Sequence, residues 1–409
     1  MKVLLLTQWY PPEPYKLFSD LAQSLKGMGH TLSVLTGFPN YPNGEIYPPY
    51  KLRLWQKDRI EDIPVTRVIL YPEHSRSALR RILNYLSFVS SATILGPWLL
   101  NRPDVIFVHC TPYIVAIPAW VMSRIWRVPF VFNVQDLWPE TLQATGMMKN
   151  PKALRMVGRF ADWVYRRAAA IVVISPGFRS NLIAKGVPEE KIHVISNWVD
   201  VTHFRPLPPN METAGKLGLE GKFNVMFAGS MGTVQGLGTV LEAAALLREH
   251  SEIQFVLVGG GVEHQRLKDQ AREMSLENVI FPGQFPEAAM PDYFALADVL
   301  LVHLCDDPLF RITIPHKIFA YLASAKPILA ALSGDAANVV VDAQAGLACP
   351  PNDPRALADT VYKFYKMSAE ERETMALAGR HVACESYSRE YLVNQISNVL
   401  QSVAVSSSA

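Results

Sequence analysis

The chain is poor in cysteine and carries almost no net charge. Its 409 residues include four cysteines, Cys110, Cys305, Cys349 and Cys384, and they form no C-x-x-C pair or His/Cys cluster. This pattern predicts reduced thiols in a reducing compartment and excludes a disulfide scaffold or a structural zinc site. The 39 basic and 37 acidic side chains leave a formal net charge of +2. That balance argues against a nucleic-acid partner, because duplex binding requires a strongly basic face.

The chain also lacks a signal-peptide pattern. Its first twelve residues hold only one short apolar run, Val3–Leu6, so we predict no leader. One run of nineteen residues, 82–100, has no charge and follows Arg80 and Arg81. It is long enough to span a bilayer, but its serines and an expected helix break at Gly96-Pro97 weaken that interpretation. A partly buried amphipathic helix is favoured, with contact to a membrane surface as the alternative.

Short apolar runs alternate with helical patterns along the whole chain. A helix is predicted over Phe18–Met28, where apolar residues recur every three or four positions, and Gly29 is its expected C-cap. The runs that we interpret as strands are 3–6, 32–35, 105–108, 130–132, 171–174, 194–195, 224–227, 254–258, 279–281, 299–301 and 328–330. Continuous apolar strands separated by helices predict parallel sheets covered on both faces.

A composition shift divides this α/β pattern into two parts of similar size. The segment Arg205–Asn210 is rich in proline and cannot continue a helix or a sheet, so it is the predicted linker. We therefore expect one doubly wound, Rossmann-like domain over 1–205 and a second over 206–388. Ligands of open α/β sheets bind at the carboxyl ends of the strands, which places the expected site in a central cleft between the domains.

Two glycine-rich turns follow strands in the second domain. Their candidate ligand-binding residues are Gly229, Ser230, Gly232, Gln235 and Gly236 in the first turn and Gly259, Gly260 and Gly261 in the second. Backbone N–H groups in such turns, and the helix that follows, suit a phosphate group. Neither turn fits the P-loop pattern or clearly carries the acidic residue that NAD ribose needs. Tight turns without a ligand remain the alternative.

A few charged or titratable side chains are placed where the cleft is expected. Lys317 follows Pro315 at a predicted helix start, where the helix dipole disfavours a cation unless an anion is bound there. In the first domain His109, Asp136 and Glu140 follow the ends of two strands. Each could act in binding or acid–base chemistry, or could have only a structural role.

Several segments resemble family-4 glycosyltransferases of the GT-B type. Residues 29–36 (GHTLSVLT) are similar to that family's GHEVxVLT segment, and 194–206 (VISNWVD…FRP) to its VIPNGVD…FRP segment. Residues 39–44 (PNYPNG), 81–88 (RILNYLSF), 136–140 (DLWPE) and 314–317 (IPHK) resemble bacterial enzymes of surface-polysaccharide assembly. That branch includes transferases of L-fucosamine and fucose.

The resemblance implies a function and roles for individual residues. It implies a nucleotide-sugar donor, usually UDP-linked, in the second domain. It also implies a glycan acceptor in the first, often on a polyprenyl diphosphate and near Tyr15, Asn40 and Glu140. His109 matches a family histidine that faces the donor sugar, and helix 389–405 is expected to pack back on the first domain. No metal or other cofactor is expected, and the implied location is the cytoplasmic face of the membrane.

The sequence departs from the family pattern on the donor side. A pair of glutamates found in many members is replaced by Ile312 and Ala320. Ser230 and Gln235 stand where many members have an Arg and a Lys that hold the diphosphate. Lys317, and Arg311 beside it, are then the expected source of positive charge. We therefore expect His109, Asp136 and Lys317 to be the catalytic residues.

Two other functions stay open from the sequence. A UDP-sugar 2-epimerase has the same architecture, and a non-catalytic subunit of a polysaccharide-assembly complex is also compatible with the missing glutamates. We expect peripheral membrane attachment through Arg80, Arg81 and run 82–100, aided by the aromatic residues Tyr47, Tyr50 and Trp55.

Overall fold

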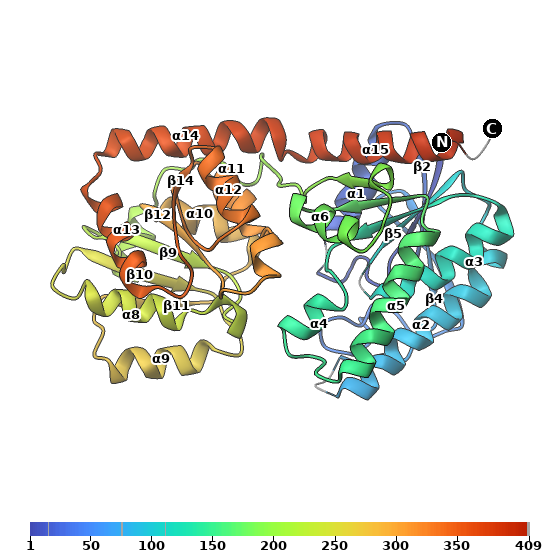
Figure 1. Ribbon diagram of the computed structural model, residues 1–409, viewed down its shortest axis with the longest axis horizontal. Helices are drawn as coiled ribbons and strands as arrows, with labels where there is room; N and C mark the ends of the chain where they lie inside the picture. The colour runs from blue at the N-terminus through green and yellow to red at the C-terminus, as the bar shows by residue number, and fades with distance from the viewer. Residues whose placement is uncertain (15, 75–76, 111, 407–409) are drawn as a thin grey trace. The chain divides into compact units, whose positions relative to one another are not determined.

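The computed structural model describes residues 1–409 except 15, 75–76, 111 and 407–409. The chain forms two compact units (Figure 1). The first comprises Met1–Ile195 and Val393–Ala409, and the second comprises Ser196–Leu392. The proline-rich segment 205–210, which we predicted as a linker, lies within the second unit and leads into its first helix.

The first unit contains an eight-stranded sheet in the order β3-β4-β2-β1-β5-β6-β7-β8. All neighbours are parallel except β3, which pairs with β4 in the antiparallel sense. Its strands are β1 (Lys2–Leu6), β2 (Thr31–Gly37), β3 (Trp55–Ile60), β4 (Ile63–Val68), β5 (Val105–His109), β6 (Phe130–Val134), β7 (Ala170–Val173) and β8 (Ile192–Val194). The strand order reverses between β1 and β5, which is where doubly wound sheets bind ligands at their carboxyl edge.

The helices of the first unit cover this sheet. They are α1 (Lys16–Gly27), α2 (Ala78–Leu99), α3 (Ala116–Trp126), α4 (Glu140–Ala144), α5 (Pro151–Arg167) and α6 (Pro176–Ala184). The prediction that Gly96-Pro97 breaks the apolar run is wrong, because α2 continues to Leu99. A Cβ at Gly96 would lie 2.9 Å from Met122 Sδ on α3, so this glycine allows the two helices to approach closely.

The second unit contains a six-stranded parallel sheet in the order β11-β10-β9-β12-β13-β14. Its strands are β9 (Phe223–Ala228), β10 (Ile253–Val258), β11 (Val279–Gly283), β12 (Val299–His303), β13 (Ile328–Ala331) and β14 (Gly346–Cys349). Its helices are α7 (Met211–Leu217), α8 (Gly238–Leu246), α9 (His264–Glu273), α10 (Met290–Ala295), α11 (Lys317–Ala323), α12 (Asp335–Asp342), α13 (Pro354–Lys366) and α14 (Ala369–Ser386).

Alternate strand residues of this sheet belong to two separate cores. Val225 and Phe227 of β9 pack with α8, α9 and α13, whereas Met226 and Ala228 pack with α10, α11, α12 and α14. This alternation follows from the two-residue period of a strand, and it explains why the central strands are mostly apolar on both faces. Helices therefore cover both faces of the sheet, as the sequence predicts.

The last helix, α15 (Arg389–Ser406), has residues in both units. Its first turn lies with the second unit, where Arg389 is 4.0 Å from Asp200. Residues from Val393 onward belong to the first unit, where Ser397 Oγ lies 2.8 Å from His30 Nε2.

Candidate functional site

The two glycine turns of the second unit pack backbone against backbone. A Cβ on Gly259 would lie 1.9 Å from the Gly229 carbonyl oxygen, and one on Gly261 would lie 2.5 Å from that of Met231. The Gly229 N–H donates to Val258 O at 3.0 Å, and the Met231 N–H donates to Gly260 O at 2.8 Å. Glycine is therefore required at 259 and 261 by the contact between the turns as well as by their positive φ angles.

Most of the predicted ligand-binding residues in these turns already donate their N–H groups within the protein. Gly232 N–H donates to the Gln235 side-chain oxygen at 2.9 Å, and Gly259 N–H donates to Gly283 O at 2.8 Å. Gln235 therefore holds the turn itself. Within the described residues, the N–H groups of Ser230, Gly260 and Gly261 have no such acceptor. Among the predicted ligand-binding residues, these three are the donors that the turns can offer to a phosphate.

The first turn is also fixed from the neighbouring strand β12, by residues that the sequence analysis missed. His303 Nδ1 lies 2.7 Å from the Gln235 carbonyl oxygen, and Cys305 Sγ lies 3.4 Å from that of Thr233. A Cβ on Gly236 would lie within about 3 Å of both side chains. Because β12 neighbours β9 at the reversal of strand order, these contacts set the shape of the turn at the edge where ligands bind.

Lys317 is the cationic side chain next to the glycine turns. It starts α11, and its Nζ lies 3.8 Å from the centroid of the Phe227 ring and beside Gly229, where a Cβ would be 2.7 Å away. No hydrogen bond or ion pair of Nζ exists within the described residues. Burial lowers its pKa from 10.5 to about 7. Because α11 has only seven residues, its dipole is weak. The charged form of Lys317 is therefore destabilised more by burial than by the dipole repulsion that we expected.

Tyr321, one helical turn after Lys317, attaches α11 to the end of β9. Its hydroxyl donates to Ala228 O at 3.1 Å and accepts from Ala228 N–H at 3.0 Å. The ladder between β9 and β12 ends one residue earlier, at Phe227, so the tyrosine hydroxyl takes the place of the missing strand partner. The sequence analysis did not identify this contact, which places Lys317 and the first turn on one rigid support.

We expect Tyr321→Phe to destabilise the second unit through the loss of these two hydrogen bonds, and not through the loss of a ligand contact. The variant leaves the buried N–H and C=O of Ala228 without a partner, which costs about 1–3 kcal/mol for each unsatisfied group. The midpoint of urea unfolding should therefore fall with the m-value unchanged. Tyr362→Phe, on α13, is the matched control because this hydroxyl has no hydrogen bond within the described residues. An unchanged midpoint for Tyr321→Phe would contradict the assigned role.

Arg311, the second expected source of positive charge, is engaged on the surface. Its guanidinium forms two hydrogen bonds with the Asp306 carboxylate, at 2.9 and 3.0 Å. The side chain of Arg311 is 56 % exposed. Lys317 is thus the better-placed cation of the two, because binding an anion costs it no existing ion pair.

In the first unit Asp136 lies in the loop after β6 and is half-buried. Its backbone oxygen accepts from the Tyr113 hydroxyl at 2.7 Å, and the Tyr113 ring stacks on Trp138 with centroids 5.1 Å apart. Burial raises the pKa of the Asp136 carboxyl, which has no partner within the described residues. A carboxylate with a raised pKa on a backbone held by Tyr113 suits a general base.

The other predicted residues of the first unit have structural contacts. His109 ends β5, is fully buried and lies 5.2 Å from Phe18 between ring centroids. Burial lowers its pKa to about 4, so it is neutral at pH 7. Glu140 forms an ion pair with Lys185 at 2.5 Å. Contact of His109 or Glu140 with a substrate stays a prediction.

Asn40 belongs to a buried polar network at the carboxyl ends of β1 and β2. Its side-chain oxygen accepts from Asn84 at 3.2 Å, and its N–H donates to Glu13 at 2.9 Å. Glu13 also accepts from the N–H groups of Tyr10 and Tyr41, and burial raises its pKa to about 7. The sequence analysis missed Glu13, which joins the loop after β1 to the loop after β2. Tyr15 lies outside the described residues.

Two family models match consecutive parts of the chain. Residues 16–198 match the family described as glycosyl transferase 4-like domain, and residues 212–382 match glycosyl transferases group 1. These two stretches lie largely within the first and second units, respectively.

Similar curated proteins come from bacteria. The chain is 27% identical over 298 residues to WbjE of Pseudomonas aeruginosa, which is named a probable glycosyltransferase; the match covers 71% of this chain and 72% of that protein. It is 28% identical over 315 residues to WcaI of Escherichia coli K12, whose name assigns it to colanic acid biosynthesis; the match covers 74% of this chain and 76% of WcaI.

Solved structures with the same fold cover nearly the whole chain. A sucrose-phosphate synthase from Thermosynechococcus elongatus has a TM-score of 0.77 at 16% identity, with 99% of each chain covered. Anabaena HepE, solved with UDP and glucose, has a TM-score of 0.72 at 19% identity, with 98% of this chain and 100% of HepE covered. The GT-B fold expected from the sequence is confirmed.

Proposed function

The chain belongs to the glycosyltransferases of the GT-B type, and on that premise we propose which substrates its two units bind. The second unit binds a UDP-linked sugar, and the first binds a glycan acceptor on a polyprenyl diphosphate. The reaction serves the assembly of a bacterial surface polysaccharide. The similarity to WbjE and WcaI supports this assignment, and so does the UDP held by HepE.

The observation that carries the proposal is the environment of Lys317. Its amine is partly buried next to a glycine turn at the carboxyl edge of a doubly wound sheet, and it has no acceptor within the described residues. A diphosphate would supply the missing counter-charge and would accept from the N–H groups of Ser230, Gly260 and Gly261. The same contacts would stabilise UDP as it leaves the sugar.

In the first unit we propose that Asp136 accepts the proton of the attacking acceptor hydroxyl. Its raised pKa and its fixed backbone favour that role. We assign His109 to the side that faces the donor sugar, where a neutral imidazole could accept or donate a hydrogen bond.

We further propose that the first unit attaches to the inner membrane surface through α2. Leu79–Leu99 could span a bilayer by length and mean hydropathy alone, yet 33% of this stretch is buried within the unit. The amide of Asn84, on its inner face, contacts Gln8 at 2.5 Å and the Tyr71 carbonyl at 2.7 Å. The outer face exposes an apolar row, here called the α2 stripe, formed by Leu79, Ile82, Leu83, Leu86, Ile94 and Trp98. An exposed apolar row on a helix tied to the sheet suits a membrane surface.

A panel of nucleotide sugars tests the donor. We expect UDP and one or a few UDP-sugars to raise the Tm in thermal-shift measurements, whereas GDP- and dTDP-sugars should not. If only nucleotides other than UDP stabilise the protein, the proposed donor class is wrong.

The affinity for UDP should depend on pH through Lys317. In the free protein its pKa is about 7, and a bound diphosphate raises that pKa toward its ordinary value. UDP binding therefore takes up a proton, and its affinity should be highest below pH 7 and fall as the pH rises above 7. The terminal phosphate of UDP loses its last proton at pH ~6, which is below the pH range in which Lys317 changes its charge.

Titration calorimetry in buffers of different ionisation enthalpy measures this proton uptake. Lys317→Arg is the matched variant, because arginine stays charged throughout the range and should abolish the dependence. Equal proton uptake by the wild type and Lys317→Arg would assign the titration to another group.

A further inference from the structure

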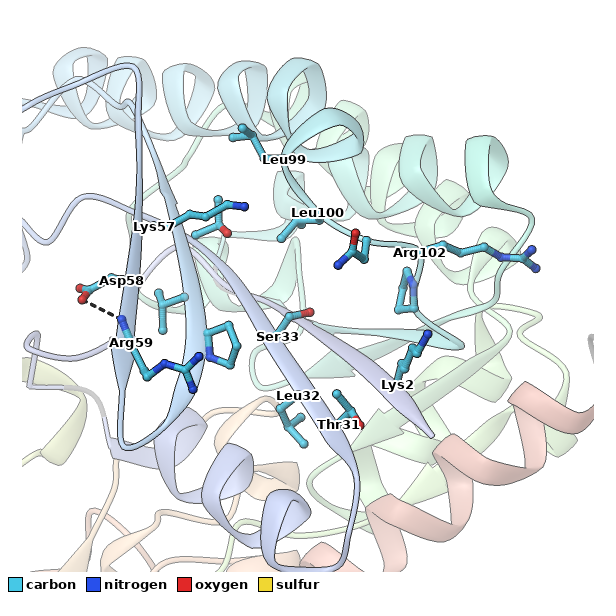
Figure 2. A pocket seen from close by; sticks show the side chains of 15 residues that line it. Lys2, Thr31, Leu32, Ser33, Lys57, Asp58, Arg59, Leu99, Leu100 and Arg102 are labelled. Carbon is cyan, nitrogen blue, oxygen red and sulfur yellow. Dashed lines mark hydrogen bonds between the residues drawn. The ribbon is translucent and has the colours of Figure 1, made fainter.

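A cavity of about 710 Å³ lies in the first unit, lined by the starts of β1 and β2, the β3–β4 hairpin and the segment after α2 (Figure 2). Its charged lining is unbalanced. Four cationic residues, Lys2, Lys57, Arg59 and Arg102, contribute to it, and Asp58 is the acidic one. We call this the basic pocket.

No carboxylate pairs with the cations of the basic pocket within the described residues, although the Arg59 guanidinium donates to the Asp62 backbone oxygen at 3.3 Å. Lys57 pairs with Thr66 and Arg59 with Pro64 across the hairpin, so both project from the same face. Figure 2 shows Lys57 extending toward Leu100, and Arg102 at the rim with its guanidinium turned outward. Within the described residues none of the four cations forms an ion pair.

Asp58 does not neutralise the basic pocket, because its carboxylate is already engaged. It accepts from the Tyr50 hydroxyl at 2.6 Å and from the backbone N–H of Arg59 at 2.8 Å, and it forms an ion pair with the buried Arg67 at 3.4 Å. The hydrogen bonds and Arg67 hold the pKa of Asp58 below its usual value, so it stays ionised. The pocket therefore keeps an excess of positive charge.

The basic pocket adjoins the end of the α2 stripe. Leu99 and Leu100 line the pocket, and the preceding Trp98 is 87% exposed. Tryptophan is enriched at the boundary between lipid tails and headgroups, where cations meet lipid phosphates. A purely polyanionic ligand would match the cations but would leave the apolar row beside them unexplained.

We propose that the basic pocket binds the phosphate of an anionic phospholipid headgroup while the α2 stripe lies in the bilayer interface. This inference rests on the membrane attachment proposed above and names its lipid partner. The headgroup belongs to the bilayer and not to the glycan acceptor. The pocket lies at the amino ends of β1 and β2, whereas Gln8 and Asn40 follow their carboxyl ends, and five residues of β1 separate the two by roughly 17 Å.

Vesicle binding tests the proposal with the full chain. Vesicles of phosphatidylcholine, with and without phosphatidylglycerol, are compared for the wild type and for Lys57→Gln/Arg59→Gln. The double variant should bind the anionic vesicles roughly 30-fold more weakly, which corresponds to ~1 kcal/mol per cation at 1.4 kcal/mol per tenfold. Binding to pure phosphatidylcholine should not change. Lys216→Gln/Lys222→Gln, with the same charge change on exposed residues of the second unit, should behave as wild type.

The outcomes separate this inference from the proposals on which it rests. If the double variant binds anionic vesicles like the wild type, the basic pocket is not the headgroup site, although membrane attachment stands. If the wild type ignores both kinds of vesicle, the inference and the attachment both fail, while UDP binding still tests the donor site independently. Inorganic phosphate is also tested as a competitor of vesicle binding. If it occupies the pocket as strongly as phosphatidylglycerol vesicles do, the pocket is a soluble-anion site and the lipid assignment is wrong.

Discussion

Replacing Asp136 with asparagine should lower turnover by about 10²–10⁴-fold, which is the usual contribution of a positioned general base. The amide keeps the size of the side chain but cannot accept the proton of the acceptor hydroxyl. The loop should keep its conformation, because Tyr113 holds it through the backbone oxygen of residue 136. The Tm and the affinity for UDP should therefore remain those of the wild type, and the loss should appear in kcat.

Asp62→Asn is the matched control for this substitution. Asp62 lies in the same unit, at the turn between β3 and β4, and its side chain is 82% exposed. We expect at most a small change in its turnover. Near-normal turnover in Asp136→Asn would exclude Asp136 as the base, and equal losses in both variants would indicate a shared structural effect.

Replacing Lys317 with alanine should lower kcat/KM roughly 10- to 150-fold, because a charge-assisted contact contributes about 1.5–3 kcal/mol. UDP affinity should fall with it, because the diphosphate stays beside this amine after transfer and has gained a further negative charge on leaving the sugar. In the part of the chain that the structure describes, this partly buried amine has no counter-charge, so its removal should leave the Tm unchanged or higher. Lower affinity together with undiminished stability identifies a ligand contact.

The choice of control lysine follows from the structure. Lys326 donates to the carbonyl oxygens of Ala295 and Ala297, at 2.9 and 2.7 Å, so its loss would disturb the fold. Lys216 is exposed on α7, and Lys216→Ala should bind UDP as the wild type does. Equal UDP affinity in the wild type and Lys317→Ala would remove Lys317 from the site and leave Arg311 as the next candidate.

Most of the strands that the sequence predicted are buried on both faces, but the buried strand β4 and the strand β14 were not predicted. Val105–Val108 and Phe255–Val258 are continuous apolar runs because helices cover both sides of the sheet. The edge strand β3 was not predicted, because its residues alternate between exposed and half-buried and include Lys57 and Arg59. Edge strands with exposed charges do not carry the apolar signal on which the prediction relied.

Only those parts of the site whose residues lie close together in the sequence could be predicted. The glycine turns and Lys317 were found because their spacing along the chain reflects a strand-to-helix turn. Tyr321, His303 and Glu13 were missed because their partners lie far away in the sequence; for Tyr321 the separation from Ala228 is 93 residues. Which N–H groups remain available also depends on contacts between the two turns, which no local pattern records.

Release of UDP in the presence of a lipid-linked glycan tests the central claim most directly. The wild type should release UDP in proportion to the sugar added to a polyprenyl-diphosphate-linked acceptor, and only when donor and acceptor are both present. An epimerase would change the donor sugar and release no UDP in proportion to acceptor extension. A non-catalytic subunit would neither change the donor sugar nor release UDP. The result of an epimerase or that of a non-catalytic subunit, obtained with an intact UDP-sugar and acceptor, would contradict the proposed transferase function.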